Sequence, residues 1–236
     1  MFQELSLTKL KTLQQGNPLI VVPFREQLEQ KRGEQLKEFV SYFTKLELPL
    51  MSVLIVEQES GKKFNRGALL NIGVRFAKRN GFKYIIAHDV DLLPKKEILP
   101  YYKVYPKQPI HIGKAWIDKY NYPDFLGGVL SISVDDMEKI NGFPSNFWGW
   151  GGEDDAMKYR FKFKNIKVWQ PTSRSGFIEM KHIDTRIIQD AKNMFKWEGM
   201  NLEKANKNNS GIKDLKFKVL DKAFLAPTVK KIVVSI

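Results

Sequence analysis

The sequence predicts an α/β protein whose central sheet is mostly parallel and is covered by helices on both faces. Two observations predict this class: short apolar runs rich in β-branched residues, and amphipathic helical stripes that alternate with them. Strands that alternate with helices are joined by crossovers, so they run parallel. Such a sheet binds its ligands beyond the carboxyl ends of its strands.

The first half of the chain carries the clearest alternation. Leu19-Ile20-Val21-Val22-Pro23 is a short apolar run ended by proline, which predicts a buried strand. Apolar residues then recur at i, i+3, i+4 and i+7 over 36–43, as on one face of a helix. The same reasoning predicts a strand over 51–56, a helix over 69–81 with a basic last turn and a final glycine, and a strand over 84–87.

The second half is less regular. Four prolines between residues 100 and 123 predict loops. Beyond them we expect a strand at 127–133, helices at 134–140 and 154–163, and a strand at 166–169. After His182 the pattern predicts a helix, a polar break at 206–211, and two alternating segments at 212–220 and 229–236 that can pair.

Length and composition narrow the class of protein. The 236 residues are 43% hydrophobic, enough for a sizeable core, and include no cysteine, which rules out disulfides and thiolate metal sites. No apolar run approaches the roughly 20 residues that span a bilayer, and residues 1–17 lack the apolar core of a signal peptide. We therefore expect a soluble, cytoplasmic protein.

Positive charge is concentrated in the last third of the chain. The formal net charge is +13, and residues 156–236 hold 18 Lys and Arg against 7 Asp and Glu, a net of +11. Such a surface suits nucleic acid, an anionic membrane, or an acidic or phosphate-bearing substrate. An ordinary solvated face is an equally good interpretation, because no nucleic-acid-binding motif accompanies the lysines. A peripheral contact of this basic region with an anionic membrane or with an acidic acceptor is the expectation that we carry forward.

The segment Phe147-Trp148-Gly149-Trp150-Gly151-Gly152-Glu153-Asp154-Asp155 is the most informative in the chain. Its glycines indicate a bend, a moving loop or close approach to a ligand. The three acids that follow favour a helix N-terminus, where the dipole stabilises negative charge. A tryptophan ring offers a flat face for a sugar. A buried turn before an acidic helix start is the structural alternative.

His88-Asp89-Val90-Asp91 follows a predicted strand, so both aspartates point the same way while Val90 points into the core. Paired carboxylates with few other ligands suit Mg²⁺ or Mn²⁺, completed by substrate phosphates. His182, with Glu179 and Asp184 close by in sequence, is a candidate partner, although an isolated histidine is more often an ordinary one.

Two further motifs point to a nucleotide. Pro23-Phe24-Arg25 follows the first strand, and Phe64-Asn65-Arg66-Gly67 opens a helix, so each places an aromatic ring beside a guanidinium. Neither a Walker loop nor G-x-G-x-x-G is present. Metal-held phosphates, a sugar platform and a carboxylate base together indicate a nucleotide-sugar transferase.

The chain resembles the beta-1,4-galactosyltransferase family, which consists of inverting, metal-dependent transferases of the GT-A (Rossmann-like) fold. Five collinear blocks carry the resemblance: 22–25, 64–73, 88–94, 127–129 and 141–155. It implies a GT-A catalytic domain at 1–185, with a family-like core at about 21–184. Residues 186–236 would then be a basic C-terminal extension packed on that domain.

The resemblance also implies roles for individual residues. The donor pocket would be lined by Pro23, Phe24, Arg25, Phe64, Arg66, Asp89, Val90, Asp91, Gly128 and Trp150. Trp150 would lie on a loop that closes over the substrates. Asp154 would be the catalytic base, Glu153 would hold a sugar hydroxyl, and Asp155 would assist acceptor binding. The metal, Mn²⁺ with Mg²⁺ as a possible substitute, would be held by Asp91, His182 and either Glu179 or Asp184.

The chain departs from the family pattern at the third ligand and at Phe125. Glu179 and Asp184 stand where different members carry a methionine or a second histidine, which leaves the ligand open and makes Mg²⁺ more acceptable. Phe125 replaces a tyrosine that helps to exclude an N-acetyl group. We therefore expect UDP-galactose as donor and a glycan or glycolipid hydroxyl as acceptor, in a bacterial or viral enzyme. No nucleic-acid partner is expected. The alternatives are an N-acetylgalactosaminyltransferase of the same fold and a non-catalytic sugar-binding module.

Overall fold

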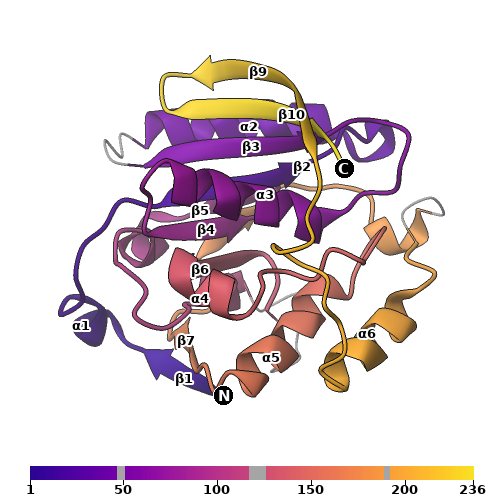
Figure 1. Ribbon diagram of the computed structural model, residues 1–236. Helices are drawn as coiled ribbons and strands as arrows, with labels where there is room; N and C mark the ends of the chain where they lie inside the picture. The colour runs from indigo at the N-terminus through magenta and orange to yellow at the C-terminus, as the bar shows by residue number, and fades with distance from the viewer. Residues whose placement is uncertain (47–50, 117–125, 189–191) are drawn as a thin grey trace.

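A six-stranded sheet forms the centre of the protein (Figure 1). The computed structural model describes residues 1–46, 51–116, 126–188 and 192–236. The strands lie in the order β6, β4, β2, β3, β10, β9. Their bounds are β2 Leu19–Phe24, β3 Ser52–Gln58, β4 Tyr84–His88, β6 Val129–Ser133, β9 Lys218–Ala226 and β10 Val229–Ser235. Strands β4, β2, β3 and β10 are parallel to one another, whereas the outer strands β6 and β9 are antiparallel to their neighbours.

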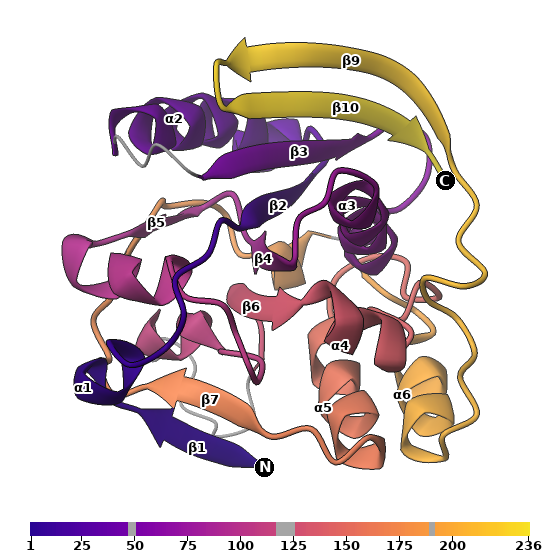
Figure 2. The same ribbon diagram turned by 60° about the vertical axis from the view of Figure 1, so that its left-hand side comes forward.

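The inner strands of this sheet are buried on both faces, because their successive residues belong to two different cores, whereas the edge strand β9 is largely exposed. In β2, Ile20 and Val22 pack in the core that contains Phe39 and Phe43 of α2 (Arg32–Lys45). Leu19 and Val21 pack in the core of α3 (Arg66–Arg79). Figure 2 shows these two helices on opposite sides of the sheet. The sheet is therefore held rigidly, with its strand ends available for a site.

The remaining elements surround the sheet. β1 (Phe2–Leu5) pairs in parallel with β7 (Val168–Pro171), and β5 (Leu92–Pro94) pairs antiparallel with β8 (Phe177–Glu179). Helices α5 and α6 lie side by side in both views (Figures 1 and 2). The helices are α1 Leu7–Leu10, α4 Val134–Lys139, α5 Glu153–Phe163 and α6 Lys196–Lys204; the 3-10 turns are η1 Leu28–Gln30, η2 Lys96–Tyr102, η3 Ile112–Trp116 and η4 Thr185–Ile187.

The predicted class and the predicted order of elements are confirmed. Two details differ. β1 was not expected, because Phe2–Leu5 is too short and too polar to give a strand pattern by itself. The strand expected at 212–220 begins only at Lys218, since Gly211, with a φ of +153°, and the turn after it keep the preceding residues out of the sheet.

The C-terminal residues add to the same sheet. β10 pairs with β3 from Val229↔Val53 to Val234↔Gln58, and β9 pairs with β10 at the edge. In Figure 1 both are the yellow strands beyond β3. Residues 186–236 thus supply two strands to the central sheet of the expected catalytic domain. None of the helices that the structure describes has the length and apolar character needed to cross a membrane.

Candidate active site

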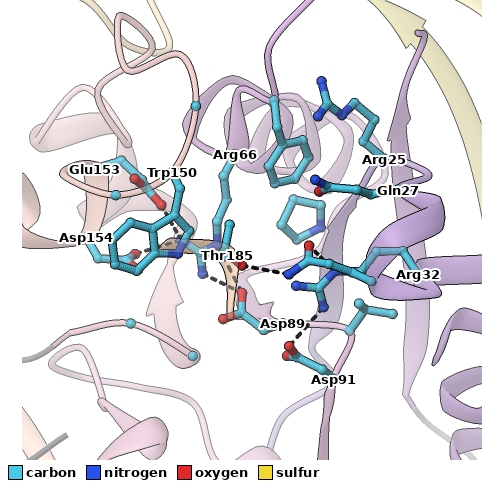
Figure 3. Close-up of a pocket in the computed structure, with 18 of the residues that line it drawn as sticks. Arg25, Gln27, Arg32, Arg66, Asp89, Asp91, Trp150, Glu153, Asp154 and Thr185 are labelled. Atoms are coloured by element: carbon cyan, nitrogen blue, oxygen red, sulfur yellow. Dashed lines mark hydrogen bonds and ion pairs between the residues drawn. The ribbon is translucent and has the colours of Figure 1, made fainter. Parts of the chain in front are cut away.

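A cavity of about 580 Å³ opens beyond the carboxyl ends of β2 and β4 (Figure 3). Parallel pairing of β2 with β4 brings the residues after Phe24 and after His88 to the same edge of the sheet. The starts of α3 and α5 and the segment after β8 add to the wall, and further residues come from the start of α2, from η3 and the residues just before β6, and from α6. The cavity therefore collects groups from widely separated regions of the chain.

His88 fixes the turn that carries the two aspartates. It is fully buried, its Nδ1 lies 2.8 Å from the backbone oxygen of Asp89, and its Nε2 lies 2.8 Å from the hydroxyl of Tyr102. Burial lowers the pKa of His88 to about 4, so the ring is neutral at physiological pH. A neutral ring donates from Nδ1 to the carbonyl and accepts from the tyrosine. His88 thus supports the site from behind.

Asp91 and His182 meet at one side of the cavity. His182 Nε2 lies 3.0 Å from Asp91 Oδ2, and Arg32 Nη1 lies 2.9 Å from the same oxygen. Burial favours the neutral acid, but the hydrogen bonds from His182 and Arg32 outweigh it and hold the pKa of Asp91 well below its usual range. The hydrogen bond to Asp91 in turn raises the pKa of His182. An ionised carboxylate beside an imidazole is a suitable start for a Mn²⁺ site.

The two candidates for a third ligand lie in different places. Asp184 lines the cavity, whereas Glu179 is on β8, opposite Leu92 of β5, and is not among the residues of the cavity wall. No group of three or more His, Asp or Glu side chains stands ready for a metal in the described part of the chain. The residues present therefore fit a metal held by Asp91 and His182 and completed by phosphate oxygens.

Arg66 lies at the centre of an ion cluster on the opposite side of the cavity. Its guanidinium is 2.9 Å from Asp89, 2.6 Å from Asp154 and 3.6 Å from Glu153. Although burial opposes the charge, these carboxylates raise the pKa of Arg66 above its ordinary value. Arg66 is thus a permanent cation facing three acids, and it joins the end of β4 to the start of α5 (Figure 3).

Two acids of the cluster, Glu153 and Asp154, stand at the N-terminus of α5, as the sequence predicts. Gly151 and Gly152 have φ angles of +88° and +107°, so only glycine makes this sharp entry into the helix without strain. Burial, and then the charge of Asp154, raise the pKa of Glu153 to about 7. Burial also raises the pKa of Asp154, against the effect of Arg66. Glu153 Oε2 is buried and makes no hydrogen bond within the described residues, so it can receive a ligand hydroxyl.

Trp150 is 41% exposed at the mouth of the cavity. Lys196 of α6 places its ammonium 5.5 Å from the centre of the Trp150 ring and 5.7 Å from that of Trp197. The side-chain amide of Asn193 donates to the carbonyl oxygen of Gly151 at 3.3 Å. The loop before α5 therefore rests on the segment that leads into α6.

The residues expected to bind the nucleotide lie on the α2 and α3 side. Pro23, Phe24, Arg25 and Phe64 line the cavity. The guanidinium of Arg25 lies 5.9 Å from the centre of the Phe64 ring and donates to the backbone oxygen of Lys62. An aromatic face next to a guanidinium suits a base and its phosphates.

The cavity brings together nearly every residue that the sequence singles out. Its wall includes Pro23, Phe24, Arg25, Phe64, Arg66, Asp89, Val90, Asp91, Gly128, Trp150, Glu153, Asp154, Asp155, His182 and Asp184. Their individual roles stay predictions. Glu179 lies elsewhere, and Phe125 falls outside the described residues.

Sequence reasoning missed Gln30, Arg32, Thr185 and Lys196, which also line the wall. Arg32 and Lys196 carry no local motif, and only the packing of α2 and α6 brings them to the cavity. The one available signal was the run of charged and amide residues just after Pro23-Phe24-Arg25.

Two family models match successive parts of the chain. One, described as the N-terminal region of glycosyl transferase group 7, covers residues 11–103. The other, described as the N-terminal domain of galactosyltransferase, covers residues 108–183. Together they include every residue of the cavity wall except Asp184, Thr185 and Lys196.

Curated relatives and solved structures agree with these models. Beta-1,4-galactosyltransferase 7 of Drosophila melanogaster is 32% identical over 211 residues, and beta-1,4-galactosyltransferase 3 of Homo sapiens is 38% identical over 136 residues. The catalytic domain of the Drosophila enzyme, solved with xylobiose, superposes with a TM-score of 0.77 at 26% identity over 94% of each chain. A mutant of that enzyme, solved with manganese, UDP-Gal and xylobiose, gives 0.78 with the same identity and coverage.

The chain matches only part of these full-length relatives. The alignments cover 85% of this chain and 62% of the Drosophila protein, and 55% of this chain and 34% of the human protein. These relatives are animal proteins, so the expected bacterial or viral origin is not supported. The expected contact with an anionic membrane gains no support from them either.

Proposed function

This chain belongs to the beta-1,4-galactosyltransferase family, and we propose on that basis that it transfers galactose from UDP-galactose to a hydroxyl of a glycan acceptor, with inversion, to form a β linkage. One observation carries the proposal: a single cavity holds a metal-competent pair, Asp91 and His182, opposite a cluster in which Arg66 holds Asp89 and Asp154. The two ends suit the two halves of the reaction, departure of the diphosphate and attack of the acceptor.

The donor would lie along the β2 and β4 strand ends. Arg25 and Phe64 provide a face for the uridine and a charge for its phosphates. Asp91 and His182 would hold Mn²⁺, as suggested by the manganese and UDP-Gal in the related structure. When bound, the ion supplies Lewis-acid neutralisation of the leaving diphosphate. Asp184, from the same wall, is our choice for a third ligand.

Asp154 would act as the general base. It lies at the first turn of α5, where the helix dipole and Arg66 both stabilise its ionised form. In the reaction its carboxylate accepts the proton of the acceptor hydroxyl, whose oxygen attacks the anomeric carbon from the side opposite the diphosphate. Glu153 Oε2 is buried and has no hydrogen-bond partner among the described groups, so it would orient a sugar hydroxyl.

The acceptor would lie under Trp150, at the mouth of the cavity. The indole is half-exposed and beside Lys196, which leaves a flat apolar face toward solvent. The related Drosophila enzyme was solved with xylobiose, and a xylose-ended glycan is therefore the first acceptor class to test.

The test is transfer of radiolabelled galactose from UDP-galactose, with Mn²⁺, to an array that contains xylobiose and other short glycans. We expect transfer by the wild type and a loss of about 10²–10⁴-fold in kcat for Asp154→Asn, because the mutant keeps the shape but lacks the base. Asp135→Asn, in the first turn of α4, is the matched control and should transfer normally. Equal rates for the wild type and Asp154→Asn would refute the base assignment, and an array without any galactosylated product would refute the transferase.

A further inference from the structure

Arg32 occupies a place at the metal-competent end of the cavity that no motif of the sequence indicates. It is the first residue of α2, and Lys31 before it has a φ of +55°, which reverses the chain between η1 and α2. The reversal turns the side chains of both Gln30 and Arg32 toward the cavity. Only 17% of the Arg32 side chain is exposed.

Arg32 is held in this position by three side chains. Its Nη1 donates to Asp91 Oδ2 at 2.9 Å and to Gln35 Oε1 at 2.8 Å, and its Nε donates to Gln30 Oε1 at 3.2 Å. Figure 3 shows the guanidinium pointing at Asp91. Fixing such a long side chain costs conformational entropy, and three hydrogen bonds offset this cost. The position of Arg32 is therefore specific.

Gln30 extends this arrangement to the histidine. The side-chain amide is buried, and its Nε2 donates to the backbone oxygen of Ile183 and to the hydroxyl of Thr185, both at 2.8 Å. It also lies 3.3 Å from His182 Nδ1. Gln30 and Arg32 therefore contact the pair from two sides, Gln30 at His182 and Arg32 at Asp91.

A divalent ion and Arg32 cannot share Asp91 Oδ2 favourably. An ion bound to this oxygen and to His182 Nε2 would lie about 2 Å from each, on the side where the oxygen already accepts from His182. Arg32 Nη1 is 2.9 Å from the same oxygen, so the guanidinium and the ion would lie within about 5 Å of each other and repel. A divalent ion can therefore bind favourably here only if Arg32 moves away from Asp91 or pairs with another anion.

We propose that Arg32 is an internal counter-cation of the metal site: it neutralises Asp91 before the donor arrives and passes to the donor diphosphate when the metal binds. The exchange makes metal and nucleotide bind cooperatively, because the diphosphate supplies the anion that Arg32 loses. This inference rests on the proposed function for the identity of the donor and the metal. It adds that the metal binds weakly until the nucleotide is also bound.

The experiment measures the affinity for Mn²⁺ by electron paramagnetic resonance of the free ion, with and without saturating UDP. Without UDP, we expect Arg32→Gln to bind Mn²⁺ about tenfold more tightly than the wild type, since the competing cation is gone. With UDP, the affinity of the wild type should rise, and that of Arg32→Gln should rise about tenfold less. Arg32→Lys, which keeps the charge but has fewer donors, should fall between the two.

Arg79→Gln is the matched control, because it removes one positive charge from the exposed end of α3 and should behave as the wild type. If the wild type binds Mn²⁺ but Arg32→Gln binds it equally or more weakly without UDP, the role of Arg32 is refuted while the metal-dependent transferase survives. If the wild type does not bind Mn²⁺ even with UDP, both proposals fail. A role of Arg32 limited to folding would lower the melting temperature without tightening the binding of Mn²⁺.

Discussion

The two ends of the cavity pair arginine with carboxylates in opposite proportions. At one end two nitrogen donors, Arg32 and His182, converge on the single carboxylate of Asp91, and its pKa falls. At the other end a single guanidinium, that of Arg66, faces three carboxylates, and the pKa values of Glu153 and Asp154 rise. The same residue types thus produce one carboxylate whose pKa is lowered and a cluster of carboxylates whose pKa values are raised. The ratio of cations to acids, more than burial, separates the two ends, since both are largely enclosed.

This comparison predicts its largest effect at Arg66. Arg66→Gln leaves three acids without their cation, so we expect the free energy of unfolding to fall by about 3–5 kcal/mol at pH 8, where those acids would be ionised. At pH 4 the loss of stability should be much smaller, because protonated carboxyl groups carry no charge for the guanidinium to neutralise. Urea unfolding at both pH values measures this.

Arg75→Gln on the same helix is the matched control. Arg75 donates to the backbone oxygens of Ile212 and Leu215, so its loss should cost the same at both pH values. An Arg66→Gln penalty that does not depend on pH would show that the cluster acts through packing alone.

Glu153 should produce the next largest effect. Its pKa is raised to about 7 in the folded protein, from an ordinary value of 4.5, so the folded state retains a proton that the unfolded state releases between these pH values. The favourable contribution is complete below pH 4.5 and is lost as the pH rises to 7. Glu153→Gln carries no such proton, and we expect it to be about 1–3 kcal/mol more stable than the wild type at pH 8 and equal to it at pH 4.5.

Thermal unfolding across this pH range tests the prediction. Glu198→Gln, at an exposed site on α6, should follow the wild-type curve at every pH. If the melting temperatures of the wild type and Glu153→Gln changed with pH in parallel, the pKa of Glu153 would not be raised in the folded protein. The contrast between the two ends of the cavity would then be wrong.

The smallest effect concerns the third ligand. Asp184 lies in the cavity wall with Asp91 and His182, whereas Glu179 lies on β8 outside it. We therefore expect Asp184→Asn to weaken Mn²⁺ binding about tenfold in the presence of UDP, and Glu179→Gln to leave it unchanged. Calorimetric titration of Mn²⁺ into both variants measures this, and each variant is the control for the other. If Glu179→Gln weakened the binding and Asp184→Asn did not, the third ligand would be Glu179 on β8.

The sequence predicted the half of the site that is built from strand ends and helix starts. Asp89 and Asp91 were expected after a strand because β4 is a clear apolar run, and Glu153 and Asp154 at a helix start because glycines precede them. The structure brings all four residues to the cavity wall. These signals are local, since each depends on the element next to the motif. Residues that reach the cavity through tertiary packing gave no such signal, and Arg32, Gln30 and Lys196 belong to this group.

The same distinction applies to the fold. The order of strands and helices could be read from periodicity, but the antiparallel direction of β6 could not, because hydrophobic pattern does not encode strand direction. Likewise the pairing of β9 with β10 follows from their alternation, whereas the place of β10 beside β3 depends on contacts between opposite ends of the chain.

The position of β10 has a consequence for how the protein folds. Val229–Ser235 pairs with β3, and the carbonyl oxygen of Ile236 accepts from Lys62, so the edge of β3 is covered by a strand that is far away in sequence. Until β10 is in place, the open edge of β3 offers unpaired backbone groups to other chains. Contacts so distant in sequence also form slowly. An incompletely folded molecule is therefore most exposed to aggregation at this edge.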